Sequence, residues 1–159
     1  MSSLHFSPLP SRVYTINDMS AAKIAVVTGA VRTLPSPSPP LSSRPANQPN
    51  LPKNRGIGLA ICQTLAATIS TPLVLYAVSR TGANLGIRPS SAAVSVEYGK
   101  ISLTDGASIT ALAARVEQEQ GACDVLINNA GLYHYATDLT DAQRTEIVDV
   151  NYRGTLAVF

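Results

Sequence analysis

The sequence predicts an α/β fold whose parallel sheet is covered by helices on both faces, a doubly wound sheet. Short apolar runs rich in β-branched residues alternate with longer segments in which apolar residues recur every three or four positions. Strands separated by helices in this way form right-handed βαβ units. The chain has 159 residues, 45% of them hydrophobic, which allows one domain with a sizeable core.

The first strand is expected over residues 24–27. The run IAVV is apolar and β-branched, as in a strand buried on both faces of a parallel sheet. The first helix should begin near Gly56. Its apolar face is predicted to contain Ile57, Ile61 and Leu65, which recur at intervals of four residues.

The second and third strands follow. Residues 72–78 form a second apolar run, whose proline stands at the first position, where a strand loses no ladder hydrogen bond. Val94, Val96 and Tyr98 alternate with other residues, as expected of a third strand. Both runs are short enough to be strands of one sheet.

The last elements complete the alternation. A helix is expected over residues 108–120, with Gly121 as its stop signal. The run DVLINNAG predicts a fourth strand and the turn that follows it. Thr140 and Gln143 have the spacing of a capping box and predict a third helix that runs toward the C-terminus.

Residues 31–53 interrupt the pattern between the first strand and the first helix. They hold seven of the eleven prolines, which excludes a helix or a central strand and predicts a disordered loop inserted in the first βα connection. The run PSPSPP could also be a ligand of an SH3-like partner. When residues 31–53 are removed, Ala30 joins Asn54 and the text becomes VVTGANRGIGLAI.

A retained intron is one explanation of this segment, and a genuine inserted loop is the other. Val31 is encoded by GTN and Lys53 can be encoded by AAG, so the segment can begin with GT and end with AG, the limits of a spliceosomal intron. It spans whole codons and keeps the reading frame. Comparing the gene with its mature transcript decides between the two explanations.

Composition and charge exclude several classes of function. Twelve basic against ten acidic residues give a net charge of +2 without a basic block, so neither a nucleic acid nor a membrane is expected as partner. Cys62 and Cys123 lack metal-ligand spacing, and no metal is predicted. Residues 1–18 are expected to be a flexible extension, since a mitochondrial transit peptide would contain more arginine. A cytoplasmic location is expected.

The text without residues 31–53 resembles the short-chain dehydrogenase/reductase family, whose glycine fingerprint is T-G-x-x-x-G-x-G. The motif NNAG at residues 128–131 follows the fourth strand as in that family, and Asn151 in VNYRGT matches its catalytic asparagine. Residues 108–131 are most similar to its carbonyl-reductase-like branch. The resemblance implies that residues 19–159 are a partial NADP-binding domain of Rossmann type, incomplete, with about four strands.

The glycines of the fingerprint have a physical role in nucleotide binding. Glycines between a strand and a helix N-terminus allow the backbone to approach a pyrophosphate, which free amide groups and the helix dipole stabilise; they can also serve only as a tight turn. The resemblance and this chemistry together give the candidate cofactor-binding residues, which are Thr28, Gly29, Arg55, Gly56, Ile57, Gly58, Ser79, Arg80, Leu103, Asn128, Ala130 and Gly131. Thr28 is expected to brace the turn after the fourth strand against the first.

The end of the second strand favours NADP over NAD. An acidic residue there would bind the ribose hydroxyls of NAD, whereas this chain has Ser79 and Arg80, with Arg55 in the glycine loop. Guanidinium groups suit a 2′-phosphate, although Arg80 could also be merely solvated. The family's adenine-binding aspartate is replaced by Ser102, which leaves the backbone of Leu103 for that contact.

The resemblance implies hydride transfer between NADPH and a small carbonyl or alcohol substrate, in a full-length form that can homo-oligomerise. Asn151 is the candidate catalytic residue present. The family's proton donor is a tyrosine with a lysine four residues later, and none of the six tyrosines here has that lysine. The sequence therefore allows two interpretations of the chain. It is expected to be either the cofactor-binding part of a short-chain oxidoreductase that is truncated at its C-terminus, or a catalytically inactive nucleotide-binding fragment.

Overall fold

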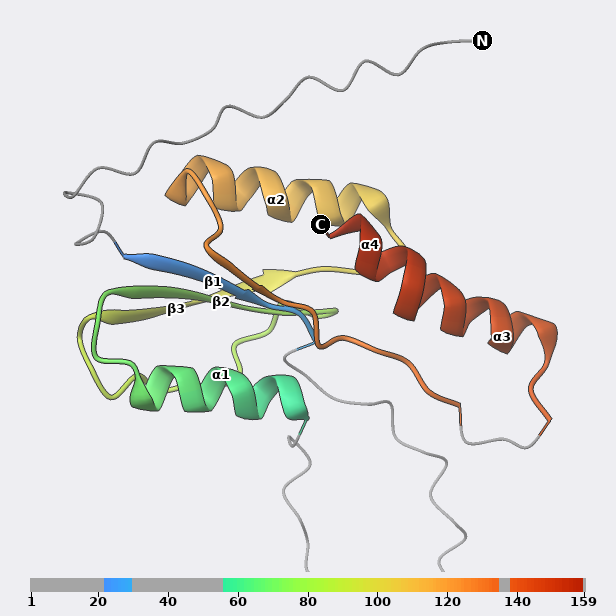
Figure 1. Ribbon diagram of the computed structural model, residues 1–159, viewed down its shortest axis with the longest axis horizontal. Coiled ribbons are helices and arrows are strands. Elements are labelled where there is room, and N and C mark those ends of the chain that lie inside the picture. The colour runs from blue at the N-terminus through green and yellow to red at the C-terminus, as the bar shows by residue number, and fades with distance from the viewer. Residues whose placement is uncertain (1–21, 30–55, 135–137, 159) are drawn as a thin grey trace, which may run out of the picture.

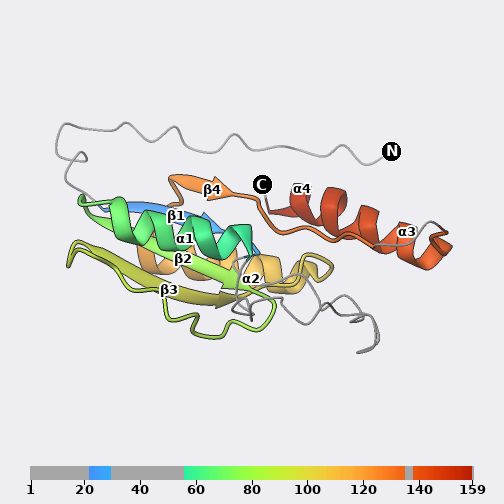
Figure 2. The ribbon, with the colours of Figure 1, turned by 90° about the horizontal axis from the view of Figure 1, so that it is seen from below.

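The computed structural model describes residues 22–29, 56–134 and 138–158. The predicted extension over residues 1–18, the proline-rich segment 31–53 and Arg55 lie outside the described residues. Four parallel strands form one sheet in the order β3-β2-β1-β4, which Figure 2 shows from one side. The strands are β1 Lys23–Val27, β2 Leu73–Ser79, β3 Val94–Lys100 and β4 Val125–Ile127.

Helices cover both faces of the sheet, so the predicted doubly wound α/β fold is confirmed. Helix α1 (Ile57–Thr68) lies on one face, and α2 (Gly106–Gln120) lies on the other (Figure 1). The helical segments α3 (Asp141–Val148), η3 (Asp149–Gly154) and α4 (Thr155–Ala157) follow one another without a break. Within the ranges described above, none of the helices has the length and apolar character that a membrane span requires.

The two faces of the sheet have separate hydrophobic cores. On the α1 side, Leu59, Cys62 and Ala66 pack against side chains of β1, β2 and β3. Burial raises the pKa of the Cys62 thiol to about 11, so this thiol is a small apolar core group at neutral pH. On the other side, Ile109 and Leu112 of α2 pack against the remaining side chains of β1 and β2. Both faces of the central strands are therefore buried.

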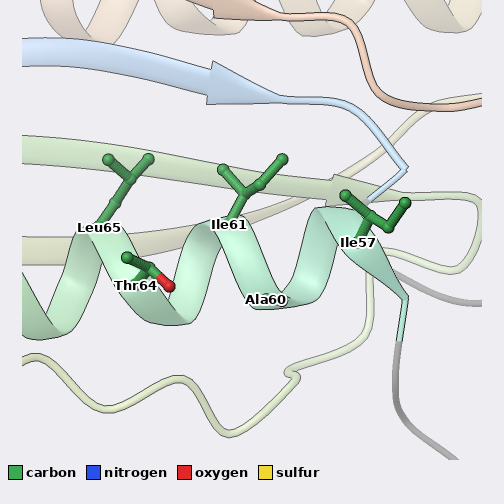
Figure 3. A pocket seen from close by; sticks show the side chains of 5 residues that line it. All are labelled: Ile57, Ala60, Ile61, Thr64 and Leu65. Carbon is green, nitrogen blue, oxygen red and sulfur yellow. The ribbon is translucent and has the colours of Figure 1, made fainter.

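The predicted face of α1 is wrong in part. The residues of α1 that are buried are Gly58, Leu59, Cys62 and Ala66. Ile57 is 76% exposed, while Ile61 and Leu65 are only partly buried at the border of the core. Figure 3 shows these three side chains on one side of α1, where with Ala60 and Thr64 they line a shallow apolar depression. Since α1 is apolar on nearly every side, its periodicity does not distinguish the face that meets the sheet.

The ends of α2 and α3 agree with the sequence signals. Thr140 accepts a hydrogen bond from the backbone of Gln143, whose side chain accepts one from the backbone of Thr140, so the capping box is present. Asp105 caps the N-terminus of α2 by accepting a hydrogen bond from the backbone of Ala107. Gly121 ends α2 in the left-handed conformation, with φ of 79°. Asp105 and Thr140 therefore mark where α2 and α3 begin, and Gly121 marks where α2 ends.

A polar network ties α2 to β2 and β3. The buried Tyr76 of β2 donates a hydrogen bond from its hydroxyl to Glu119 over 2.7 Å. Arg115 lies 5.5 Å from the centre of the Tyr76 ring and binds both Glu119 and Glu97. Burial, followed by the hydrogen bond to Glu119, raises the pKa of Tyr76, and the bond from Arg115 lowers the pKa of Glu119. Glu97 of β3 is thus held on the α2 face.

Candidate functional site

The predicted site residues within the described ranges lie together at the carboxyl ends of the parallel strands. Strand order reverses between β1 and β4, because the chain passes from β3 at one edge to β4 beyond β1. Ligands of open α/β sheets bind in the crevice outside the carboxyl ends of the strands at such a switch point. Candidates follow β1 (Thr28, Gly29), β2 (Arg80), β3 (Leu103) and β4 (Asn128, Ala130, Gly131), begin α1 (Gly56, Ile57, Gly58), end β2 (Ser79) or lie in η3 (Asn151).

Thr28 joins the turns that follow β1 and β4. Thr28 is 1% exposed. Its hydroxyl oxygen accepts hydrogen bonds from the backbone amide of Asn129 over 3.1 Å and from that of Ala130 over 3.2 Å. The hydroxyl donates to the carbonyl oxygen of Ile127 over 3.4 Å. The prediction that Thr28 braces the turn after the fourth strand against the first strand is confirmed.

Replacing Thr28 by valine is expected to destabilise the protein by about 1–3 kcal/mol, because the change keeps the side-chain shape but removes the acceptor of the partly buried Ala130 amide and one of the two acceptors of the Asn129 amide, which also bonds to Ile127. The free energy of unfolding from denaturant titration measures this. Thr68→Val is the matched control, since the exposed Thr68 hydroxyl donates, within the described part of the chain, only to the carbonyl oxygen of Thr64 in the same helix. That variant should stay within about 0.5 kcal/mol of the wild type. Equal effects of the two changes would contradict the role of Thr28.

Gly29, Gly58 and Asn129 pack together without room for further atoms. Gly29 has φ of 66°, and a Cβ atom there would lie 2.6 Å from Cα of Ala130. A Cβ atom on Gly58 would lie 2.3 Å from the carbonyl oxygen of Gly29 and 2.5 Å from Nδ2 of Asn129. That Nδ2 donates to the carbonyl oxygens of both Thr28 and Gly29. The glycine turn of β1 and the start of α1 therefore meet, although 28 residues separate Gly29 from Gly58.

The start of α1 fits an anionic ligand. Gly56, the N-cap residue, has no side chain to bind the first amide groups of α1, and α1 has no acidic residue in its first turn. Such amide groups and the helix dipole favour a phosphate. Among the described residues, the buried Nδ2 of Asn128, directly after β4, is a donor without a partner. The residues present thus fit the pyrophosphate of a dinucleotide.

Ser79 shapes the turn that follows β2. Its side chain is 3% exposed, and its hydroxyl oxygen accepts a hydrogen bond from the backbone of Gly82 over 3.0 Å and lies 3.3 Å from Oγ1 of Thr81. Arg80 follows Ser79 and is exposed. The hydroxyl of Ser79 thus bonds within the turn that carries Arg80. A contact of Ser79 with a cofactor stays a prediction.

Asn151 positions the loop after β4. Its Oδ1 accepts a hydrogen bond from the backbone of Leu132 over 2.7 Å, and its Nδ2 donates to the carbonyl oxygen of Leu132 over 2.8 Å. Asn151 lies in the π-helix η3, a helix type often found at functional sites. A Cβ atom on Gly131 would lie 3.4 Å from this Oδ1. Both polar atoms of the side chain are therefore used for positioning, and its catalytic role stays a prediction.

Leu103 contacts the helical segment that carries Asn151. Gly154, buried at the end of η3, approaches Leu103 so closely that a Cβ atom would lie 2.4 Å from its carbonyl oxygen. The Leu103 side chain packs at the border of the α2-side core. The loop after β3 and the segment after β4 are thereby in contact. The sequences of these two segments gave no signal of this contact or of the role of Gly154.

Asn129 is the site residue that the sequence analysis missed. Of the two asparagines in NNAG, the first was predicted to bind the cofactor, whereas the second bonds to the carbonyl groups of the glycine turn. A signal was available, because a turn between two strand ends carries carbonyl groups that need donors and an amide side chain supplies two. No group of three or more side chains suited to a metal occurs in the described part of the chain.

The sheet topology and the glycine turn define a Rossmann-type α/β protein. The sequence model of the short chain dehydrogenase family matches residues 53–159. Accordingly, the chain belongs to the short chain dehydrogenase family, whose members are oxidoreductases that bind a nicotinamide cofactor. The match begins at the last residue of the proline-rich segment and leaves out β1, which nevertheless lies in the middle of the sheet.

Individual relatives agree with this family. Human carbonyl reductase [NADPH] 1 is 33% identical over 105 residues, which cover 64% of this chain and 38% of that protein. Galactitol 2-dehydrogenase of Agrobacterium fabrum is 30% identical over 106 residues, 64% of this chain and 40% of the relative. The chain spans less than half the length of these curated relatives.

A solved structure supports the fold. The short chain dehydrogenase of Leptospira borgpetersenii, crystallised with bound NAD⁺, superposes with a TM-score of 0.57 at 17% identity. The superposition covers 97% of this chain and 50% of the other. At this identity the likeness concerns the fold alone.

Proposed function

We propose that this chain is the cofactor-binding part of an NADP-dependent short-chain oxidoreductase that acts on a carbonyl or alcohol substrate. The observation that carries the proposal is the closed glycine turn, in which Gly29, Gly58 and Asn129 leave no room for a side chain at the start of α1. NADPH, when bound, supplies the hydride of the reaction. This chain's residues bind and orient it, with the first turn of α1 receiving the pyrophosphate and Thr28 holding the turn beside it.

The choice of NADP rests on the end of β2. Arg80 stands exposed directly after the strand, at the place where an acidic residue would bind the ribose hydroxyls of NAD. A guanidinium group can bind the 2′-phosphate through two parallel hydrogen bonds, while a carboxylate would repel it. Human carbonyl reductase [NADPH] 1, by its name, uses NADPH, which supports the same choice.

The second candidate function is a nucleotide-binding polypeptide without catalysis. None of the six tyrosines of this sequence has a lysine four residues later, so the proton donor of the family has no match in these residues. Without that acid the alkoxide formed by hydride transfer is not stabilised. Both candidates bind NADPH, and neither expects turnover by these 159 residues. They differ in whether a full-length transcript encodes the missing tyrosine and lysine downstream.

Calorimetric titration of the 159-residue chain with NADPH and with NADH tests the binding step. NADPH is expected to bind at least about tenfold more tightly than NADH, since a charge-assisted contact is worth about 1.5–3 kcal/mol. Absence of binding by either dinucleotide would overturn the proposal.

Aldehyde and ketone reduction is expected to equal that of a heat-killed sample, with human carbonyl reductase [NADPH] 1 as the positive control. Turnover by these residues would exclude the non-catalytic candidate.

A further inference from the structure

Lys100 ends β3 beside the turn that carries Arg80. In the parallel pairing of β2 with β3, Lys100 lies opposite Ser79, the residue before Arg80. The backbone of Ile101 donates a hydrogen bond to the carbonyl oxygen of Ser79 over 2.9 Å, so the pairing continues to the very end of both strands. Neighbouring strands are about 4.8 Å apart, which places the two cationic residues at adjacent strand ends.

The turn after β2 rests on Lys100. Gly82 has φ of 66°, and a Cβ atom there would lie 3.1 Å from Cβ and 3.2 Å from the backbone nitrogen of Lys100. The hydroxyl of Ser79 holds this turn by accepting a hydrogen bond from the backbone of Gly82. Arg80 and Lys100 are therefore presented by one closely packed unit rather than by two independent loops.

The positive charge of Lys100 is not neutralised by the acids nearest to it in sequence. Side chains of a strand alternate between its faces, and Glu97 is held on the α2 face by Arg115, whereas Lys100 lies on the face of Tyr98 and α1. Asp105 caps α2. Within the described residues, neither Arg80 nor Lys100 forms an ion pair, and both are exposed.

We propose that Lys100 is a specificity-determining residue, which together with Arg80 binds the 2′-phosphate of NADP. This inference rests on the proposed function and deepens it. The buried hydroxyl of Ser79 is used within the turn, so among the described residues, which do not include Arg55, the second ligand of the phosphate comes from the neighbouring strand. A lysine acts on a phosphate as a point charge with three donors, which complements the planar fork of arginine.

Lys100→Met tests the inference by calorimetric titration of the full chain with NADPH and NADH. Affinity for NADPH is expected to fall at least about tenfold, while affinity for NADH stays within about twofold, which also shows that the variant is folded. The dependence of NADPH affinity on salt should weaken. Lys100→Arg should retain the NADPH preference. Lys23→Met is the matched control, since Lys23 begins β1 at the opposite end of the sheet, and it should leave both affinities unchanged.

Each outcome decides one of the two proposals. If the wild type prefers NADPH and Lys100→Met keeps that preference, the role of Lys100 is overturned and the proposed function stands. If affinity for NADH falls equally, Lys100 has a general structural role and the inference is overturned. If the wild type binds both dinucleotides equally, the NADP preference fails together with the inference. If the wild type binds neither, the proposed function itself fails.

Discussion

Gly58→Ala is expected to abolish measurable NADPH binding by this chain. The added Cβ atom would lie 2.3 Å from the carbonyl oxygen of Gly29 and 2.5 Å from Nδ2 of Asn129, distances at which backbone atoms must move. The start of α1 must then withdraw from the glycine turn, and Asn129 must give up its bonds to Thr28 and Gly29. Overpacking of this kind costs about 1–3 kcal/mol of stability.

Gly106→Ala is the matched control for this prediction. Both glycines lie in the first turn of an α-helix, but a Cβ atom on Gly106 would meet nothing within 4 Å. Alanine has a better helix propensity than glycine, so this variant should be as stable as the wild type or up to about 1 kcal/mol more stable. Calorimetry and denaturant unfolding measure both quantities. NADPH affinity that is unchanged in Gly58→Ala would mean that the close packing does not form the binding site.

The strands could be predicted from sequence because buried parallel strands are continuous apolar runs. The second strand was expected at 72–78 and is found at Leu73–Ser79, and the fourth lies inside the run DVLINNAG as Val125–Ile127. Their order in the sheet, β3-β2-β1-β4, is given by the structure. The buried face of α1 could not be predicted, because Ile57 and Ile61 are as apolar as the Leu59 and Cys62 that meet the sheet.

The candidate site was predicted at the level of motifs rather than of atoms. Glycine positions in a fingerprint reveal where the backbone must approach a ligand, so Gly29 and Gly58 could be identified. Hydrogen bonds between turns that are distant in the chain have no local signal, which is why the contacts of Asn129 with Gly29 and of Asn151 with Leu132 were missed. The π-helix η3 has no periodicity that distinguishes it from the α-helices on either side.

Deleting residues 31–53 is expected to strengthen NADPH binding at least about tenfold and to raise the free energy of unfolding. Gly29 and Gly58 are in contact, so the chain between them closes a ring. The sequence predicts that residues 31–53 are a loop, and the deletion shortens the spacing from Gly29 to Gly56 from 27 to 4 positions. By the (3/2)RT ln n dependence this lowers the closure cost by about 2 kcal/mol. It also restores the family's glycine spacing beside the first turn of α1.

A variant in which residues 31–53 are replaced by a glycine-serine segment of equal length separates loop length from proline content. If loop length decides, this variant binds NADPH as weakly as the wild type, and the deletion variant alone gains affinity. If the prolines decide, both variants gain. The expectation fails if the deletion variant binds NADPH with equal or lower affinity than the wild type, since the inserted segment would then support the closed turn of Gly29, Gly58 and Asn129 rather than oppose its formation.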